Sequence, residues 1–280
     1  MKSLFLLNNW KEVYFYAAFY RIAICNLLFV DLIYSIESNQ LILSNDFSHL
    51  LSNYSFFNFF YQNIVAFNIV YAISIVMYFF GIGNYFGSFF FFLLFSINSF
   101  MFSKFQTWGD KILFFSLLYF IFVNSYNYFT LNKKKLELNP YINLISHLGL
   151  ACLVIHVFYL YGINIFHKLH HKSWLYGSSF SIAIIIKQNI IVFSDIIQLA
   201  NIRFISQIGS YTAIFQQFFF IPLAIINKTR PYIILLTIAI HISIAIIFLL
   251  VKFQLIVLLA LGFVMYLPSI KNKIIEELKK

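Results

Sequence analysis

The chain consists of long apolar runs separated by short polar segments. A helix that crosses about 30 Å of hydrocarbon needs about 20 mostly apolar residues. Eight runs approach this length: Val13–Tyr34, Phe56–Phe80, Asn84–Phe102, Lys111–Leu131, Tyr141–Phe166, Phe204–Ile226, Tyr232–Leu250 and Phe253–Leu267. The pattern therefore predicts an all-α, polytopic integral membrane helical bundle with about eight transmembrane helices.

A ninth apolar stretch, Leu175–Ala200, is interrupted by polar residues. These residues are Lys187, Gln188, Asn189 and Asp195. Charged side chains are costly at the centre of a bilayer, so we expect an interfacial or re-entrant helix here. The organisation that follows is a single transmembrane domain over residues 1–270 and a short charged cytoplasmic tail over residues 271–280.

Composition narrows the class of protein further. Of 280 residues, 62% are hydrophobic and 10% are charged, whereas soluble domains carry about 25% charged residues. The 38 Phe and 19 Tyr exclude a disordered chain, and two Cys exclude a disulfide scaffold and a Cys-based zinc module. An integral membrane protein remains, with the lipid bilayer as its first partner.

The net charge of +10 is spread between the apolar runs and forms no long basic stripe, so we expect no nucleic-acid partner. The apolar stretch at the N-terminus has no small-residue cleavage site after it, and no cleaved signal peptide is expected. Of the 19 Lys and Arg, 11 lie on the side of both termini, 7 on the other side, and Arg21 within the membrane. The positive-inside rule then predicts cytoplasmic N- and C-termini and places residues 167–174 outside.

Two polar clusters fall in or beside the first spans. Arg21 and Asp31 both lie in the first span, but ten residues along a helix is about 15 Å, so they cannot pair with each other. Arg21 either snorkels or pairs with a carboxylate or polar side chain of another helix. Asp110 precedes an apolar run beside Trp108, which is typical of a helix N-cap with an interfacial tryptophan.

The third cluster is the densest in the chain. It contains His156, Tyr161, Asn164, His167, Lys168, His170, His171, Lys172 and Trp174. His167 and His171 have the spacing of a metal-binding pair, but no Asp or Glu lies nearby as a third ligand, so we expect no metal site.

Two interpretations of this cluster stay open. It is either a basic, Trp-anchored interfacial turn or a site of proton transfer. In the second case Lys168 is the general base, because the surrounding Phe and Ile disfavour its charged form. Tyr161, seven residues before Lys168, shares its helix face, whereas His156 lies five residues before Tyr161, about 140° round the helix.

In this order, the clusters resemble the HTTM family, the transmembrane domain shared with vitamin K-dependent gamma-carboxylases. The residues in register with the family's motifs are Arg21, Ile22, Asp31, Ser96, Asn98, Trp108, Gly109, Asp110, Tyr161, Lys168, Leu169, Trp174, Gly177, His241 and Phe253. The chain departs from the pattern at His156, where Gln is frequent, at Asn164, where Ser or Ala is usual, and at Ile165, where Gly is usual.

The resemblance implies functional roles for these residues. In gamma-carboxylases, the lysine at the position of Lys168 is held to deprotonate the reduced vitamin K. By this resemblance, Lys168 would act as the catalytic base with His156 and Tyr161 beside it, and a lipid quinone or quinol would be the cofactor. The remaining expected pocket residues are Arg21, Asp110, Asn164, Trp174 and His241.

Length separates this chain from a complete carboxylase, because those enzymes carry a sizeable soluble region after the membrane domain. A bare HTTM unit resembles the sporulation-delaying protein B group, whose members are implied to assist maturation of a secreted antimicrobial peptide at a bacterial cytoplasmic membrane. The expected function is therefore assistance in maturation or export of such a peptide. The alternatives are a quinol-dependent carboxylase-like enzyme and a non-enzymatic immunity or transport component.

Overall fold

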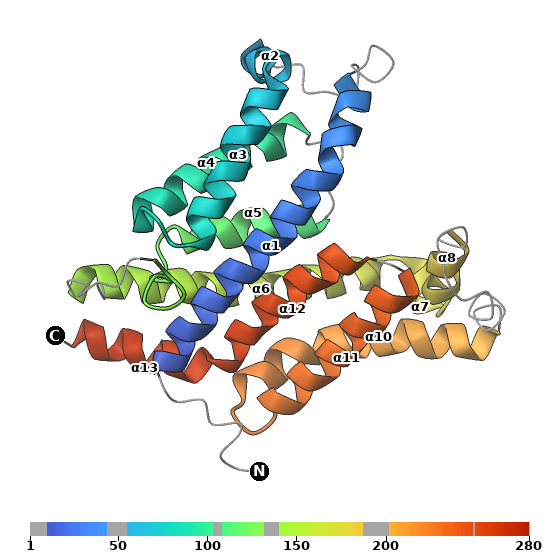
Figure 1. Cartoon of the computed structure of the whole chain (residues 1–280). Coiled ribbons are helices and arrows are strands. Elements are labelled where there is room, and N and C mark those ends of the chain that lie inside the picture. Colours follow the sequence, from blue (N-terminus) through green and yellow to red (C-terminus); the bar gives the residue numbers. More distant parts are fainter. Residues whose placement is uncertain are drawn as a thin grey trace. The chain divides into compact units, whose positions relative to one another are not determined.

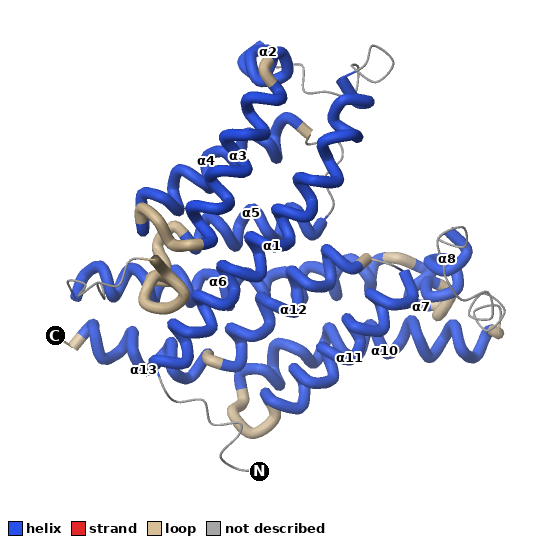
Figure 2. Tube along the Cα trace, in the orientation of Figure 1, coloured by secondary structure: helices blue, strands red, loops and turns tan. Residues whose placement is uncertain are grey.

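The computed structural model describes residues 10–43, 55–102, 108–131, 140–186, 202–248 and 250–279. All regular elements in these ranges are helices, which confirms the all-α prediction (Figure 2). Figure 1 labels them as α1 (Trp10–Leu43), α2 (Ser55–Gln62), α3 (Ile64–Phe79), α4 (Asn84–Met101), α5 (Trp108–Phe120), α6 (Pro140–His170), α7 (Lys172–Leu175), α8 (Ser179–Ile186), α10 (Arg203–Ile225), α11 (Arg230–Phe248), α12 (Val251–Met265) and α13 (Leu267–Leu278).

Five of the described helical segments are long and apolar enough to cross a membrane. They are Lys11–Ser35, Asn84–Met101, Tyr141–His170, Arg203–Ile225 and Arg230–Phe248. A sixth span results if α12 and α13, which meet at a bend of 55°, are taken together. Their outward surfaces fit lipid, because they expose large aromatic side chains such as Phe86, Phe166 and Phe215 that a water-facing surface would bury.

Two of the eight predicted spans differ from the observed helices. The run predicted over Phe56–Phe80 is broken at Asn63, whose side-chain amide donates to the Phe59 carbonyl oxygen at 2.9 Å. The helix after this break, α3, has 16 residues. The run predicted over Lys111–Leu131 is helical only as far as Phe120.

The chain leaves the helix after Phe120 because polar side chains there compete for the backbone. The Asn124 side-chain oxygen accepts from the Tyr126 N–H at 3.3 Å, and the Asn124 N–H donates to Ser146 Oγ at 2.8 Å. Side-chain bonds of this kind favour turns over helix continuation. Within the interrupted stretch Leu175–Ala200 the structure describes one helix, α8, and residues 187–200, which contain its four polar interruptions, lie outside the described residues.

The chain forms two compact units. The N-terminal unit comprises Asn8–Leu153 and Ser269–Lys280, and the C-terminal unit comprises Val154–Pro268. In the N-terminal unit, α3 packs against α1 and α4, and α4 packs against α5. In the C-terminal unit, α11 packs against both α10 and α12, and α7 and α8 pack against α10.

The charged C-terminal residues do not form a loose tail in the described part of the chain. Residues 271–278 belong to α13, whose Ser269 and Ile270 are buried in the N-terminal unit. Lys273 pairs with Glu276 one turn later at 2.7 Å, which supports the helix.

Candidate functional site

A chain of buried polar side chains crosses the C-terminal unit. Tyr161 comes from α6, His241 from α11 and Gln254 from α12. The Tyr161 hydroxyl lies 2.7 Å from Nε2 of His241, and Nδ1 of the same ring contacts Oε1 of Gln254. Tyr161 and Gln254 are buried and His241 is half-buried, so the chain is largely shielded from the surroundings.

The direction of these hydrogen bonds follows from the chemistry of the groups. An amide oxygen only accepts, so His241 must carry its proton on Nδ1 to bond Gln254. In the neutral imidazole, Nε2 is then an acceptor, and the Tyr161 hydroxyl donates to it. The arrangement aligns the phenolic O–H of Tyr161 with a base, and Gln254 fixes the tautomer.

A second pair of polar side chains, Gln216 of α10 and Thr237 of α11, also supports Tyr161. Gln216 of α10 hydrogen-bonds the Tyr161 hydroxyl and donates from Nε2 to Thr237 Oγ1 of α11 at 2.8 Å. Thr237 in turn donates to the Ile233 carbonyl oxygen at 2.7 Å. The Tyr161 ring also stacks on Phe220 with centroids 3.9 Å apart. These contacts hold the phenol in one orientation.

Lys168 lies in the last turn of α6, two turns beyond Tyr161. Its ammonium nitrogen is 4.4 Å from the centroid of the Trp174 ring, a cation–π contact. Lys168 also interacts electrostatically with His241. The structure therefore brings Tyr161, Lys168, Trp174 and His241, all expected pocket or catalytic residues, into one region of the C-terminal unit.

The turn after α6 positions Trp174. Gly177 has a φ of +72°, a left-handed conformation that favours glycine, and its carbonyl oxygen accepts from Ser206 Oγ of α10 at 2.8 Å. A Cβ at this position would lie 2.6 Å from Cγ and 2.9 Å from Cα of Gln207. The turn can therefore dock closely on α10 only with glycine at position 177.

We expect Gly177→Ala to lower the stability of the protein by about 1–3 kcal/mol, through backbone strain and the collision with Gln207. The measurement is the midpoint of thermal unfolding in detergent. Gly162→Ala is the control, because a Cβ there meets only Ile221 Cδ1, at an ordinary 3.6 Å. Equal midpoints for the two variants would contradict the role given to Gly177.

The other expected residues of this cluster lie elsewhere on α6. His156 faces another side of the helix and packs beside the Tyr159 ring, with centroids 6.2 Å apart. The Asn164 side chain is exposed. His167 and His171 do not share a helix face, because α6 ends at His170 and His171 is the extended N-cap of α7. No group of three or more potential metal ligands occurs among the described residues.

Arg21 and Asp110 belong to the N-terminal unit. Arg21 is buried and does not snorkel, and no carboxylate or polar side chain accepts a hydrogen bond from it among the described residues. Its Nη2 instead donates to the carbonyl oxygens of Tyr128 and Phe129, in the segment that leaves the helix after Phe120. Asp110 is the third residue of α5 and lies inside its first turn, so it complements the helix dipole and is not the N-cap.

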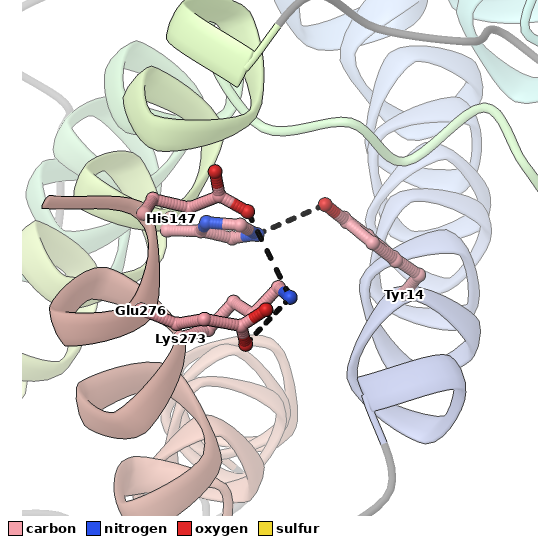
Figure 3. A network of polar contacts seen from close by, with 5 residues as sticks. Tyr14, His147, Lys273 and Glu276 are labelled. Carbon is pink, nitrogen blue, oxygen red and sulfur yellow. Dashed lines mark hydrogen bonds and ion pairs between the residues drawn. The ribbon is translucent and has the colours of Figure 1, made fainter. Parts of the chain in front are cut away.

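The sequence analysis did not single out His147, which lies in a further polar cluster (Figure 3). The Tyr14 hydroxyl of α1 is 3.0 Å from His147 Nε2, and Lys273 of α13, drawn in the same view, forms an ion pair with Glu276 at 2.7 Å. The available signal was a histidine within a long apolar run, where an ionisable group needs partners. Gln254 and Gln216 also lie within apolar runs, but nothing in the sequence distinguishes them from the other amide side chains of the predicted spans.

No known protein family, curated protein or solved structure matches this chain.

Proposed function

We propose that this chain is an integral membrane protein of about eight crossings that uses proton transfer at Lys168 to mature or export a secreted antimicrobial-type peptide. The observation that carries the proposal is the hydrogen-bonded chain of Tyr161, His241 and Gln254, whose Tyr161 shares a face of α6 with Lys168 two turns further along. The resemblance of the sequence motifs to the HTTM family supplies the class of substrate.

The residues divide the chemistry between them. Lys168, as a neutral amine, accepts a proton from the substrate, and the resulting ammonium is stabilised over the Trp174 ring. Tyr161 presents a hydroxyl whose proton already points to His241 Nε2, so it can exchange a proton without a rearrangement of helices. Gln254 and Gln216 orient the two rings.

A quinol-dependent, carboxylase-like enzyme is the second candidate, favoured by the apolar surface around Lys168. Leu169, Leu175 and Tyr176 are exposed next to it, so the site adjoins a surface that lipid-soluble molecules contact. A lipid quinol would supply an acidic phenolic O–H there. Lys168 would accept that proton, and Trp174 would provide an aromatic face for the ring.

Comparison of secreted peptides tests the proposal. A strain lacking the gene is complemented with the wild-type chain, and small peptides in the medium are identified by mass spectrometry. We expect at least one peptide whose mature form requires the gene. Identical secreted peptides with and without the gene would contradict peptide maturation and leave the quinol reaction, which is assayed separately by quinol consumption in membranes.

The topology part of the proposal predicts that the turn after α6 is extracytoplasmic. A single cysteine placed at Lys172 or Ser173, in a chain without Cys25 and Cys152, should react with a membrane-impermeant maleimide in intact cells. Lys172 is the better position, because the Ser173 hydroxyl hydrogen-bonds Ser179 at 2.8 Å. Labelling that requires permeabilised cells would reverse the orientation.

A further inference from the structure

Trp174 lies in a helix that is too short to fix its own position. The four residues of α7 are all at least partly exposed, and isolated helices of this length are not stable. Backbone bonds of this segment are local, as from the Trp174 N–H to the His171 carbonyl oxygen at 3.0 Å. The position of the Trp174 ring over the Lys168 ammonium therefore depends on what holds the turn after α7.

Ser206 of α10 holds this turn through two hydrogen bonds. Its hydroxyl donates to the Gly177 carbonyl oxygen at 2.8 Å and accepts from the Ser181 N–H at 3.2 Å. A serine hydroxyl has one proton and two lone pairs, so it can make both bonds at once. Gly177 lies between α7 and α8, and Ser181 lies in the first turn of α8. One side chain, 3% exposed, thus joins both the turn and the start of α8 to α10.

Ser210, one turn later on the same face of α10, adds a third bond. Its Oγ accepts from the Phe180 N–H at 3.0 Å. The first N–H groups of a helix have no acceptor within it, and Ser206 and Ser210 supply acceptors for two of those in α8. Gly209 makes room for this approach, because a Cβ there would lie 2.6 Å from Cγ of Phe180. The start of α8 is therefore capped by hydroxyls of a different helix.

Two further hydroxyls hold the residues on either side of Trp174. Tyr211 of α10 donates to the Leu175 carbonyl oxygen at 3.0 Å. Ser179, the first residue of α8, donates to the Ser173 hydroxyl at 2.8 Å. The residues before and after Trp174 are thus each bonded to an element outside α7. Hydrogen bonds are short and directional, so a change in these contacts should move the indole ring.

We propose that Ser206, Ser210 and Tyr211 are positioning residues of the proton-transfer site, which hold the turn after α7 on α10 so that the Trp174 ring lies over the Lys168 ammonium. They act through the backbone of residues 175–181, to which their hydroxyls are bonded. A role in proton transfer rests on the function proposed above, whereas the contact between Lys168 and Trp174 can be measured without it.

The test measures this contact in the full chain purified in detergent. Trp10 and Trp108 are replaced by phenylalanine, so that Trp174 is the sole tryptophan. A cation over the indole face perturbs its fluorescence, and deprotonation of Lys168 removes that cation. Between neutral and alkaline pH we expect a change in emission that is absent when Lys168→Met is added. This difference is the Lys168-dependent signal, and its absence from the single-tryptophan chain overturns the proposal.

Variants assign the signal to the hydroxyls of α10. Ser206→Ala combined with Ser210→Ala should lose most of it, and Tyr211→Phe should lose part of it. Ser243→Ala is the control and should keep it, because Ser243 donates within its own helix, to the Ala239 carbonyl oxygen. If the double serine variant does not fold, Tyr211→Phe decides, since it removes only a hydroxyl from a side chain that is 36% exposed. An unchanged signal in the double variant or in Tyr211→Phe, or a lost signal in Ser243→Ala, overturns the proposal.

The maturation assay separates this positioning role from the proposed function. At equal membrane level, the double serine variant should mature the peptide about 10-fold more slowly, because a displacement of about 1 Å near reacting groups is costly in rate. An unchanged rate together with a lost fluorescence signal overturns the role in proton transfer. If the wild-type gene matures no peptide, the proposed function fails, and the fluorescence result still decides whether α10 positions Trp174.

Discussion

Replacement of Lys168 by alanine is expected to reduce the rate of peptide maturation by about 100-fold or more, the contribution of a positioned general base. Lys168→Arg should fail to the same extent. Arginine keeps the positive charge over Trp174 but does not deprotonate near neutral pH. The measurement is the amount of mature peptide in the medium, normalised to the amount of protein in the membrane.

Lys172→Ala is the matched control, since Lys172 is exposed and lies four residues further along. It should leave maturation unchanged. If Lys168→Arg retains activity while Lys168→Ala loses it, the charge alone is required, and the general-base role of Lys168 is wrong. Such a result would favour the anchoring of a lipid phosphate by a basic, Trp-lined turn.

The second large effect is expected on stability, from Gln254→Leu. This change removes the acceptor of the His241 Nδ1–H inside the C-terminal unit, where Gln254 is 1% exposed. A buried donor left without a partner costs about 1–3 kcal/mol, so the thermal unfolding midpoint should fall by several degrees. Tyr161→Phe should be coupled to it, because both changes act through one ring.

Gln217→Leu provides a control of identical chemistry. The side-chain oxygen of Gln217 is buried without a partner among the described residues, so leucine there should be neutral or stabilising. A similar loss for Gln217→Leu and Gln254→Leu, or additive effects of Gln254→Leu and Tyr161→Phe, would show that the Tyr161–His241–Gln254 chain is not a unit.

The helical, apolar character of the chain could be predicted because it depends on sums over local sequence. About 20 consecutive apolar residues favour a spanning helix whatever they pack against. The predicted runs over Asn84–Phe102 and Phe204–Ile226 therefore agree closely with α4 and α10. The run over Lys111–Leu131 was wrong because hydropathy does not register the bonds of Asn124, one of which reaches Ser146 on another helix.

The candidate site was predictable only in the part that lies on one helix. The spacing of Tyr161 and Lys168 on α6 follows from 3.6 residues per turn. The partner of Tyr161 could not be derived in this way, because His241 lies 80 residues later and Gln254 a further 13, on two other helices.

The sequence by itself determined an all-helical chain with several apolar helices and the common face of Tyr161 and Lys168, since hydrophobic burial and helical periodicity act locally. Tertiary structure decided which polar groups meet. Packing of α6, α11 and α12 brings His241 within hydrogen-bonding distance of the Tyr161 hydroxyl. The segment after α5 supplies the two carbonyl oxygens that accept from Arg21, more than 100 residues away in the sequence. Hydrogen bonds are directional and short, so a pattern of polarity along the chain leaves their partners open until the helices pack.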